Sequence, residues 1–374
     1  MTTGESRWPL ELAWCPTCSL VQITETVPPE KLFRDYAYFS SFSDTMVTHA
    51  RSIADRLREQ RKLNSDSLVV EIASNDGYLL QWYHKSGVPV LGIEPARNIA
   101  KVAESERGVR TISEFFGQDL AQQLVRDGYR ADIIHANNVL AHVADLNGVV
   151  SGFASLLKPD GVAVVEAPYL KDLLDHVEFD TIYHEHLCYF SLTALTQLFG
   201  QHGLEIVDVE RLAIHGGSLR VFAAKSGVMS VTPAVRQLLA EESQWVRDPE
   251  FYQSFGESVD KLRLELVGLL HKLKADGKRI AVYGASAKGS TLLNYFGIGR
   301  ELLDYVVDRS TIKQGRYTPG TRLKIYDPAQ LVEDRPDYCL LLTWNFADEI
   351  LKQQQRYREQ GGQFIIPVPS VRIA

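Results

Sequence analysis

One stretch, VVEIASNDGYLL from Val69 to Leu80, constrains the fold of this chain more than any other. Its β-branched residues lead through Glu71 into the small-residue turn Ala73–Gly77, after which an amphipathic segment begins. This order is typical of a buried parallel strand, a tight loop that a ligand can approach closely, and a helix N-terminus that favours an anion. The next apolar run ends at Glu94, about 20 residues after Glu71, where ribose-binding carboxylates lie in such folds. We therefore expect an adenosine-containing ligand here, bound by Glu71, Ser74, Asn75, Gly77 and Glu94.

Strand-like runs and helical segments continue to alternate after this stretch. Alternation at this spacing predicts βαβ units in a doubly wound, Rossmann-like α/β fold, whose ligands bind beyond the carboxyl ends of the strands. Two later runs, Leu204–Val209 and Ser218–Lys225, are expected to add an antiparallel hairpin at the edge of the sheet. The parallel strands are expected at residues 68–72, 88–93, 109–112, 131–136 and 162–166.

Size and charge exclude several classes of protein. A chain of 374 residues is too long for one ordinary core, so two domains and a small appendage are expected. The net charge of −7 argues against binding to duplex nucleic acid, because phosphate contacts need clustered Lys and Arg. No apolar run is long enough to cross a bilayer, and residues 1–14 lack a signal pattern. We expect a cytoplasmic protein, taken to be a monomer, with no membrane partner.

The loop after the fourth expected strand is a candidate part of the ligand site, because it follows the carboxyl end of that strand. It contains Asn137, Asn138 and His142. Asn138 is a candidate ligand-binding residue, although either asparagine could equally cap the next helix. His142 is a candidate site residue, with a packed loop histidine as the alternative.

The most informative stretch for chemistry is FDTIYHEHLCYF, residues 179–190. Tyr183, His184, Glu185 and His186 place a phenol, a carboxylate and two imidazoles within four residues. Their spacing does not match H-E-x-x-H, so a zinc protease site is not supported. A histidine with a pKa near ~6.5 can act as a base at neutral pH. The alternative is that both histidines only support the fold.

Two further loops are candidates for phosphate binding. A glycine-rich turn ends in Ser218 and Arg220, which could hold a phosphate, although hairpin glycines are often only structural. After a helical bridge, residues 279–296 repeat the strand-loop-helix pattern, which predicts a second, smaller nucleotide-binding α/β unit. The ligand contacts expected in that unit are Gly284, Ser286, Lys288 and Asn345.

These motifs together resemble the family of S-adenosyl-L-methionine-dependent C-methyltransferases that act on nucleotide-linked deoxysugars. The family's motif E-x-x-S-N-D-G-Y-L-L is matched from Glu71 to Leu80, although Ala73 stands where methyl-donor loops usually have a first glycine. The family motifs N-V-L-A-H-V and Y-H-E-H-L-C-Y-F occur at residues 138–143 and 183–190. Residues 36–41 resemble the family's Y-x-Y-x-S-S segment, and residues 284–289 and 343–346 resemble parts of its C-terminal lobe.

The resemblance implies a class I methyltransferase domain that methylates carbon next to a ketone. The implied substrate is a thymidine diphosphate-linked 4-keto-deoxysugar, methylated at C-3, as in antibiotic sugar pathways. His186 would remove the proton, Tyr183 would hydrogen-bond the enolate oxygen, and Glu185 would orient an imidazole or a sugar hydroxyl. The resemblance also places His142 toward the sugar and Tyr38 against the active site, where an aromatic contact between domains is the alternative for Tyr38.

The pair Cys15 and Cys18 forms half of a tetrahedral zinc site. In the resembling family an earlier C-x-x-C pair completes the site, and the sequence starts too late to contain that pair, so zinc is possible rather than required. Cys188 and Cys339 are not expected to be partners. The expected domains are a remnant of a zinc-binding region at residues 1–50, the methyltransferase domain at residues 51–229, and the helical bridge with the C-terminal nucleotide-binding domain at residues 230–374.

The sequence leaves other functions open. An NAD-dependent nucleotide-sugar dehydrogenase or epimerase would bind its cofactor at the Gly284 loop, but no convincing Y-x-x-x-K relay follows a suitable strand. If the protein were a non-catalytic nucleotide-sugar binder, the acid–base cluster at residues 183–186 would be accidental. Oxygen methylation is the nearest rival among methyltransferases, since it needs only a hydroxyl beside the donor.

Overall fold

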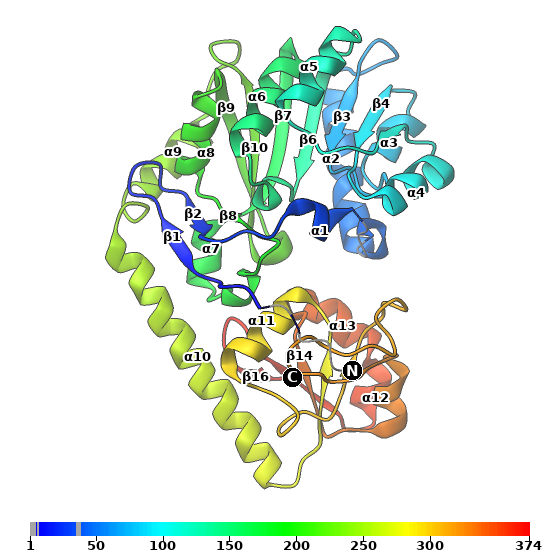
Figure 1. Ribbon diagram of the computed structural model, residues 1–374, viewed down its shortest axis with the longest axis vertical. Helices are drawn as coiled ribbons and strands as arrows, with labels where there is room; N and C mark the ends of the chain where they lie inside the picture. Colours follow the sequence, from blue (N-terminus) through cyan, green and yellow to red (C-terminus); the bar gives the residue numbers. More distant parts are fainter. Residues whose placement is uncertain (1–4, 6, 35–38) are drawn as a thin grey trace. The chain divides into compact units, whose positions relative to one another are not determined.

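The computed structural model describes residues 5, 7–34 and 39–374, and it divides into two compact lobes (Figure 1). The first lobe comprises Glu11–Tyr169 and His184–Arg247. The second lobe comprises Leu170–Tyr183 and Asp248–Ala374, together with the described residues up to Leu10. This division differs from the expected domains because a short segment from the middle of the chain belongs to the C-terminal lobe.

A seven-stranded sheet forms the centre of the first lobe. Its strand order is β5-β4-β3-β6-β7-β10-β9, and all neighbours are parallel except that β10 runs antiparallel to β7 and β9. The order reverses between β3 and β6, so the carboxyl ends of these two strands are where such a sheet binds ligands. This order confirms the doubly wound fold. The strands are β3 (Val69–Ile72), β4 (Val90–Ile93), β5 (Thr111–Ile112), β6 (Ala131–Asn137), β7 (Leu157–Pro168), β9 (Leu204–Leu212) and β10 (Ser218–Lys225).

Helices cover this sheet and bury its apolar residues. Helix α2 (Asp44–Gln60) begins at its cap Ser43, whose side chain accepts a hydrogen bond from the Met46 amide. It shares one core cluster with α3 (Leu80–Lys85) and with strand residues such as Ile133. The remaining helices of the lobe are α1 (Pro29–Phe33), α4 (Arg97–Arg107), α5 (Gln118–Arg126), α6 (Leu146–Leu156), α8 (Leu192–Gly200) and α9 (Pro233–Glu242).

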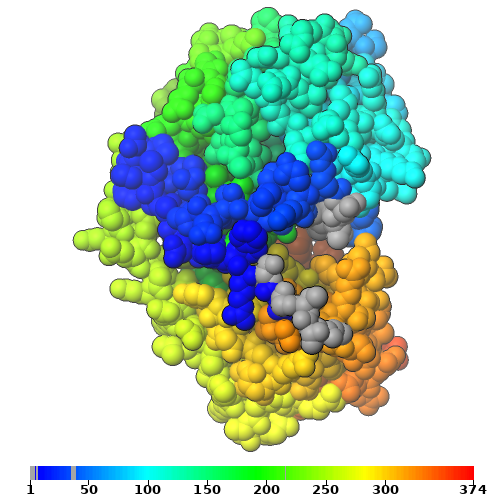
Figure 2. Space-filling view, viewed as in Figure 1, coloured from blue at the N-terminus to red at the C-terminus, as the bar shows by residue number. Residues whose placement is uncertain are grey.

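A small antiparallel sheet joins the N-terminal part of the first lobe to the middle of the chain. Its strands are β1 (Leu12–Trp14), β2 (Val21–Ile23) and β8 (Cys188–Tyr189), in that order. Figure 2 shows part of the blue N-terminal segment on the visible face of the molecule. The pairing of β2 with β8 anchors the chain directly after His186. Strands of two or three residues carry no periodicity in the sequence, and none of these was expected.

The second lobe contains a smaller sheet of the same type. Its order is β13-β12-β11-β14-β15-β16, parallel except for the last pair. This confirms the expected second Rossmann-like unit. The strands are β11 (Ile280–Tyr283), β12 (Val306–Val307), β13 (Ile325–Tyr326), β14 (Tyr338–Leu341), β15 (Gln363–Ile366) and β16 (Arg372–Ile373), and the helices after β11 are α11 (Ala287–Phe296), α12 (Ala329–Asp334), α13 (Ala347–Gln353) and α14 (Gln355–Glu359).

The longest described helix, α10 (Pro249–Ala275), lies in the second lobe (Figure 1). Asp248 caps its N-terminus by accepting a hydrogen bond from the Glu250 amide. Its buried residues recur every three or four positions and form one apolar stripe, as expected for an amphipathic helix on a domain surface. They are Val259, Leu262, Leu266, Leu270 and Leu273. Among residues 5, 7–34 and 39–374, no helix combines the length and apolar character needed to cross a membrane.

The segment Leu170–Tyr183 is an integral part of the second lobe. It forms α7 (Leu170–Asp175) and the 3-10 turn η3 (Phe179–Thr181). Phe179 is 4% exposed within the core cluster of that lobe, and its ring stacks on Phe296 with 4.6 Å between centroids. The chain therefore leaves the first lobe after β7, packs into the second, and returns at His184.

Replacing Phe179 by alanine tests whether this segment belongs to the core of the second lobe. Phe179→Ala is expected to lower the free energy of unfolding by about 3–5 kcal/mol, because it removes a fully packed ring. The control is Ile312→Ala in the same lobe, where the side chain is 44% exposed and a change below about 0.5 kcal/mol is expected. Denaturant unfolding followed by circular dichroism measures both. Equal effects of the two substitutions would contradict the assignment.

Candidate active site

The loop after β3 has an unusual backbone. Ala73 and Asn75 both have a φ of 49°, and Gly77 has a φ of 76°. Positive φ is costly for residues with a Cβ, and such conformations gather at ligand sites because the surrounding structure enforces them. Ala73 therefore adopts the left-handed conformation that a glycine would adopt more easily at this position.

Hydrogen bonds from neighbouring strands hold the loop in this shape. The Glu94 carboxylate, which is 5% exposed at the end of β4, accepts from the Asn75 amide at 2.9 Å and from the Ala96 amide at 2.8 Å. The Ser74 side chain packs on Gly92, where an added Cβ would lie 2.5 Å from the Ser74 Oγ. Burial raises the pKa of Glu94, and the two backbone amides oppose that rise. Each carboxylate oxygen still has a second lone pair for a ribose hydroxyl.

Asp76 connects this loop to the segment before α2. Its side chain is 0% exposed, and Oδ2 accepts from Ser41 Oγ at 2.5 Å and lies 3.2 Å from Arg107 Nη2. The Ser40 amide donates to Asn75 Oδ1 at 2.9 Å. The serines of the expected Y-x-Y-x-S-S segment thus dock on the loop through its asparagine and aspartate. Asp76 was not among the expected site residues, although it is part of the matched motif.

The residues at the ends of β3 and β6 fit a methyl donor better than a pyrophosphate. Glu71 Oε2, Ser74 Oγ and Asn137 Oδ1 are buried and have no hydrogen-bond partner among the described residues. Burial raises the pKa of Glu71 well above its usual value, and the charges of Asp76 and Glu94 raise it further. Such acceptors suit ribose hydroxyls and an α-ammonium group, whereas a pyrophosphate would meet the nearby charges of Asp76 and Glu94. The expected preference of this helix N-terminus for an anion is therefore not supported.

The loop after β6 continues the site. Asn138 has a φ of 56°, and its amide donates to the Glu166 carbonyl at 2.8 Å, so its backbone is fixed beside β7. His142 ends the 3-10 turn η2 (Leu140–His142) rather than capping a helix. Asp145, not either asparagine, caps α6 by accepting a hydrogen bond from the Gly148 amide.

The structure brings His142 and His186 together. Their ring centroids are 4.9 Å apart, and the Leu187 amide donates to the Ala141 carbonyl at 2.6 Å. Burial lowers the pKa of His142 to about 4, so this imidazole is neutral at physiological pH. His142 is thus a neutral neighbour of the ring of His186, which stands two residues before strand β8.

The other expected catalytic residues are placed differently. His184 and Glu185 are half-buried in the first lobe, whereas Tyr183 is the last residue of the inserted segment of the second lobe. The boundary between the lobes therefore falls within the Y-H-E-H motif. Tyr38 lies outside the described residues.

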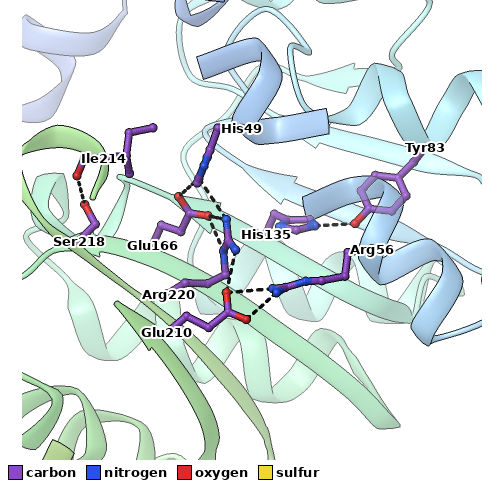
Figure 3. Close-up of polar contacts among 9 residues, drawn as sticks. All are labelled: His49, Arg56, Tyr83, His135, Glu166, Glu210, Ile214, Ser218 and Arg220. Carbon is purple, nitrogen blue, oxygen red and sulfur yellow. Dashed lines mark hydrogen bonds and ion pairs between the residues drawn. The ribbon is translucent and has the colours of Figure 1, made fainter. Parts of the chain in front are cut away.

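Arg220 does not present a free cation to a phosphate. It is 5% exposed, and its guanidinium donates from Nε to Glu166 Oε1 at 2.7 Å and from Nη1 to Glu210 Oε2 at 2.8 Å. Figure 3 shows His49 and Arg56 of α2 pointing into the same network. Burial acts to raise the pKa of Glu166, but His49 and Arg220 outweigh it and lower that pKa. The expected phosphate contact of Arg220 is therefore corrected to a buried ion-pair network.

Ser218 and His135, also drawn in Figure 3, have structural partners as well. Ser218 is 1% exposed and donates from Oγ to the Ile214 carbonyl at 3.1 Å, so its expected phosphate contact is likewise corrected. Tyr83 Oη lies 3.0 Å from His135 Nε2. Burial lowers the pKa of His135 to about 3, so the phenol donates to a neutral imidazole.

The loop after β11 in the second lobe is tightly packed. Gly284 has a φ of 100°, and an added Cβ would lie 2.7 Å from Thr343 Cγ2. Ser286 caps α11 by accepting a hydrogen bond from the Gly289 amide at 3.0 Å. Asn345 lies in the 3-10 turn after β14, next to that loop in the sheet order. These positions are where a doubly wound sheet binds a ligand, and nucleotide binding by Gly284, Ser286 and Asn345 stays a prediction.

The Cys15 and Cys18 pair forms a tight turn without a complete metal site. The Ser19 amide donates to the Cys15 carbonyl at 2.8 Å. No group of three or more potential ligands that could hold a metal occurs in the part of the chain that the structure describes. Burial raises the pKa of Cys188 to about 12, so this nearby thiol stays protonated. Two thiols do not complete a tetrahedral zinc site.

Substitution of Arg220 tests whether the network is structural. Arg220→Met leaves Glu166, which is 1% exposed, without its main counter-charge, so the free energy of unfolding should fall by about 3–5 kcal/mol. The exposed Arg236 provides the control, and Arg236→Met should change stability by less than about 0.5 kcal/mol. Denaturant titration measures both variants. Unchanged stability of Arg220→Met with a raised KM for substrate would instead support a phosphate contact.

Known proteins resemble this chain along nearly its whole length. Family models match residues 1–33 ("Putative zinc binding domain"), residues 46–209 ("Methyltransferase domain") and residues 213–369 ("C-methyltransferase C-terminal domain"). The C-methyltransferase NovU of Streptomyces niveus is 39% identical over 372 residues, which cover 99% of this chain and 88% of the relative.

More distant proteins resemble only parts of the chain. A ubiquinone biosynthesis O-methyltransferase of Azorhizobium caulinodans is 26% identical over 122 residues, which are 33% of this chain and 47% of that protein. The structure of magnesium protoporphyrin IX methyltransferase from Synechocystis with bound S-adenosylmethionine is 16% identical over 48% of this chain and 79% of that one, with a TM-score of 0.37.

The assignment of this chain to a family rests on the relative whose similarity covers 99% of the chain. It decides against the dehydrogenase and the non-catalytic binder. The chain belongs to the family of C-methyltransferases and uses S-adenosylmethionine as its methyl donor.

Proposed function

We propose that this enzyme methylates the carbon next to a ketone in a nucleotide-linked deoxysugar. The proposed substrate is a thymidine diphosphate-linked 4-keto-sugar, and the proposed position is C-3. Membership of the C-methyltransferase family supports the attack by carbon. The Y-H-E-H-L-C-Y-F and N-V-L-A-H-V motifs, shared with sugar C-methyltransferases, support the class of acceptor. The cytoplasmic location and the monomeric state stay predictions.

The contact between His142 and His186 is the observation that carries the proposal. A carbon nucleophile must first lose a proton, and His186 is the proposed base. His142 lies 4.9 Å away between ring centroids, and burial lowers its pKa to about 4. Because His142 stays neutral, His186 can accept a proton without facing a second positive charge. A charged neighbour at this distance would lower the basicity of His186.

The remaining groups of the motif have supporting roles in this proposal. Tyr183 donates a hydrogen bond to the enolate oxygen as negative charge develops there. The enolate carbon then forms a bond to the methyl carbon, the sulfur–methyl bond breaks with its electron pair moving to sulfur, and the sugar proton remains on His186. Glu185 orients an imidazole or a sugar hydroxyl, and the role expected for Tyr38 stays a prediction.

The proposed donor site is the strained loop with its neighbours. Glu94 binds the ribose hydroxyls, and the buried acceptors of Glu71 and Ser74 face the polar groups of the donor. Asn75, Gly77 and Asn138 contribute backbone in left-handed conformations, which brings the peptide groups close to the ligand.

Proton exchange at the acceptor carbon tests the role of His186 separately from methyl transfer. The keto-sugar is incubated in deuterated water with S-adenosylhomocysteine, and loss of the C-3 proton signal is followed by NMR. His186→Asn should slow this exchange by about 100-fold or more, since it removes the base. His184→Asn, two residues away in the same motif, is the control and should retain exchange within about threefold of the wild type.

Two results would contradict the proposal. Exchange at the wild-type rate in His186→Asn would exclude this residue as the base. A product methyl group on oxygen, seen by NMR after turnover with isotope-labelled donor, would exclude methylation at carbon.

A further inference from the structure

A second group of charged side chains lies in the second lobe, close in sequence to Tyr183. Asp180, in η3, is 0% exposed, and Oδ2 accepts a hydrogen bond from Trp344 Nε1 at 2.7 Å. Glu178, two residues earlier, is 4% exposed. Burial raises the pKa of Asp180, and the charge of Lys288 opposes that rise. Both carboxylates belong to the segment that the middle of the chain contributes to this lobe.

Lys288 is the cation of this group. Its Nζ lies 4.5 Å from the centroid of the Trp344 ring, a cation–π distance. Its charge acts on both Asp180 and Glu178. A pyrophosphate bound at Lys288 would bring further negative charge next to these two carboxylates, which is unfavourable in a buried setting. The surroundings of Lys288 therefore differ from those of an open phosphate site.

The same part of the second lobe also holds the backbone that follows Asp180. Thr291 of α11 donates from Oγ1 to the Ile182 carbonyl at 3.3 Å, and Phe179 stacks on Phe296 of the same helix. Asp180 and Ile182 are thus both anchored, and Tyr183 is the next residue. On the other side of Tyr183, the chain is held in the first lobe by the hydrogen bond from the Leu187 amide to the Ala141 carbonyl.

The geometry points to Trp344, Asp180 and Lys288 as positioning residues for Tyr183. In this arrangement the loop after β14 and the first turn of α11 hold the segment that carries the proposed enolate-stabilising phenol. In this inference Lys288 positions the segment that carries Tyr183. This role replaces the expected contact of Lys288 with the substrate pyrophosphate. The inference rests on the proposed function of Tyr183.

Steady-state kinetics of methyl transfer distinguish positioning from substrate binding. Trp344→Phe removes the hydrogen-bond donor but keeps an aromatic ring, and Lys288→Met removes the charge but keeps the length of the side chain. Both variants should lower kcat by about 10-fold to 100-fold, because a small displacement of a catalytic group costs rate. KM for the keto-sugar should change less than about threefold, because no substrate contact is lost.

The matched control is Lys324→Met. Lys324 also lies over an aromatic ring of the second lobe, 4.9 Å from the Tyr326 centroid, but it is exposed. Its replacement should leave kcat and KM unchanged. Circular dichroism and denaturant unfolding check that each variant is folded.

A double-mutant cycle with Tyr183→Phe separates positioning from a general loss of structure. If Trp344 acts through the phenol, Trp344→Phe should change kcat less than about twofold in the Tyr183→Phe background, because the group that it positions is already absent. A tenfold rise in KM with unchanged kcat in Lys288→Met would overturn the inference in favour of a phosphate contact. Effects that multiply in the double mutant would also overturn it. Wild-type activity of Tyr183→Phe would instead refute the proposed role of Tyr183 itself.

Discussion

The Glu94 carboxylate is the constraint on which the proposed donor site depends. By accepting from the Asn75 and Ala96 amides, it joins the loop after β3 to the end of β4. These bonds help to compensate the left-handed conformations of Ala73 and Asn75. The second lobe contains an equivalent arrangement. The Asp308 carboxylate, directly after β12, accepts hydrogen bonds from the Ala285 amide at 2.7 Å and the Ser310 amide at 2.8 Å.

Hydrogen bonds also constrain the segments around the residues of the proposed chemistry. Asp76 fixes the Ser41 segment before α2, and the loop after β6 pairs through Ala141 with the Leu187 amide. The Y-H-E-H motif is therefore held at both ends, by the second lobe before Tyr183 and by the first lobe after His186.

The sequence predicts the fold well wherever hydrophobic periodicity is strong. The expected strands at residues 68–72 and 131–136 are present within a residue, and the expected helical bridge includes the long helix α10. Periodicity cannot detect β8, which has two residues, or the docking of Phe179 into a lobe whose strands begin about a hundred positions later in the chain. Both depend on long-range packing, which no local pattern encodes.

Site residues are predictable only in part for the same reason. Glu94 was expected from its distance after Glu71, and it does bind the loop after β3. His142 and His186 were expected from short motifs, and their rings do lie together. Arg220 looks like a phosphate ligand because its partners, Glu166 and Glu210, lie on other strands, and the strand order that brings them together is not visible in the sequence. Lys288 also looks like a phosphate ligand in the sequence, because Asp180, whose pKa its charge affects, stands more than a hundred positions earlier in the chain.

The most direct test of this account is calorimetric titration of the enzyme with S-adenosylhomocysteine. Glu94→Gln should weaken binding by about tenfold or more, because one acceptor of a charged hydrogen-bonding group is replaced by a donor. Asp308→Asn, the matched change in the second lobe, should bind as the wild type does. Unchanged affinity in Glu94→Gln, or weakened affinity in Asp308→Asn, would contradict the placement of the methyl donor on the first sheet.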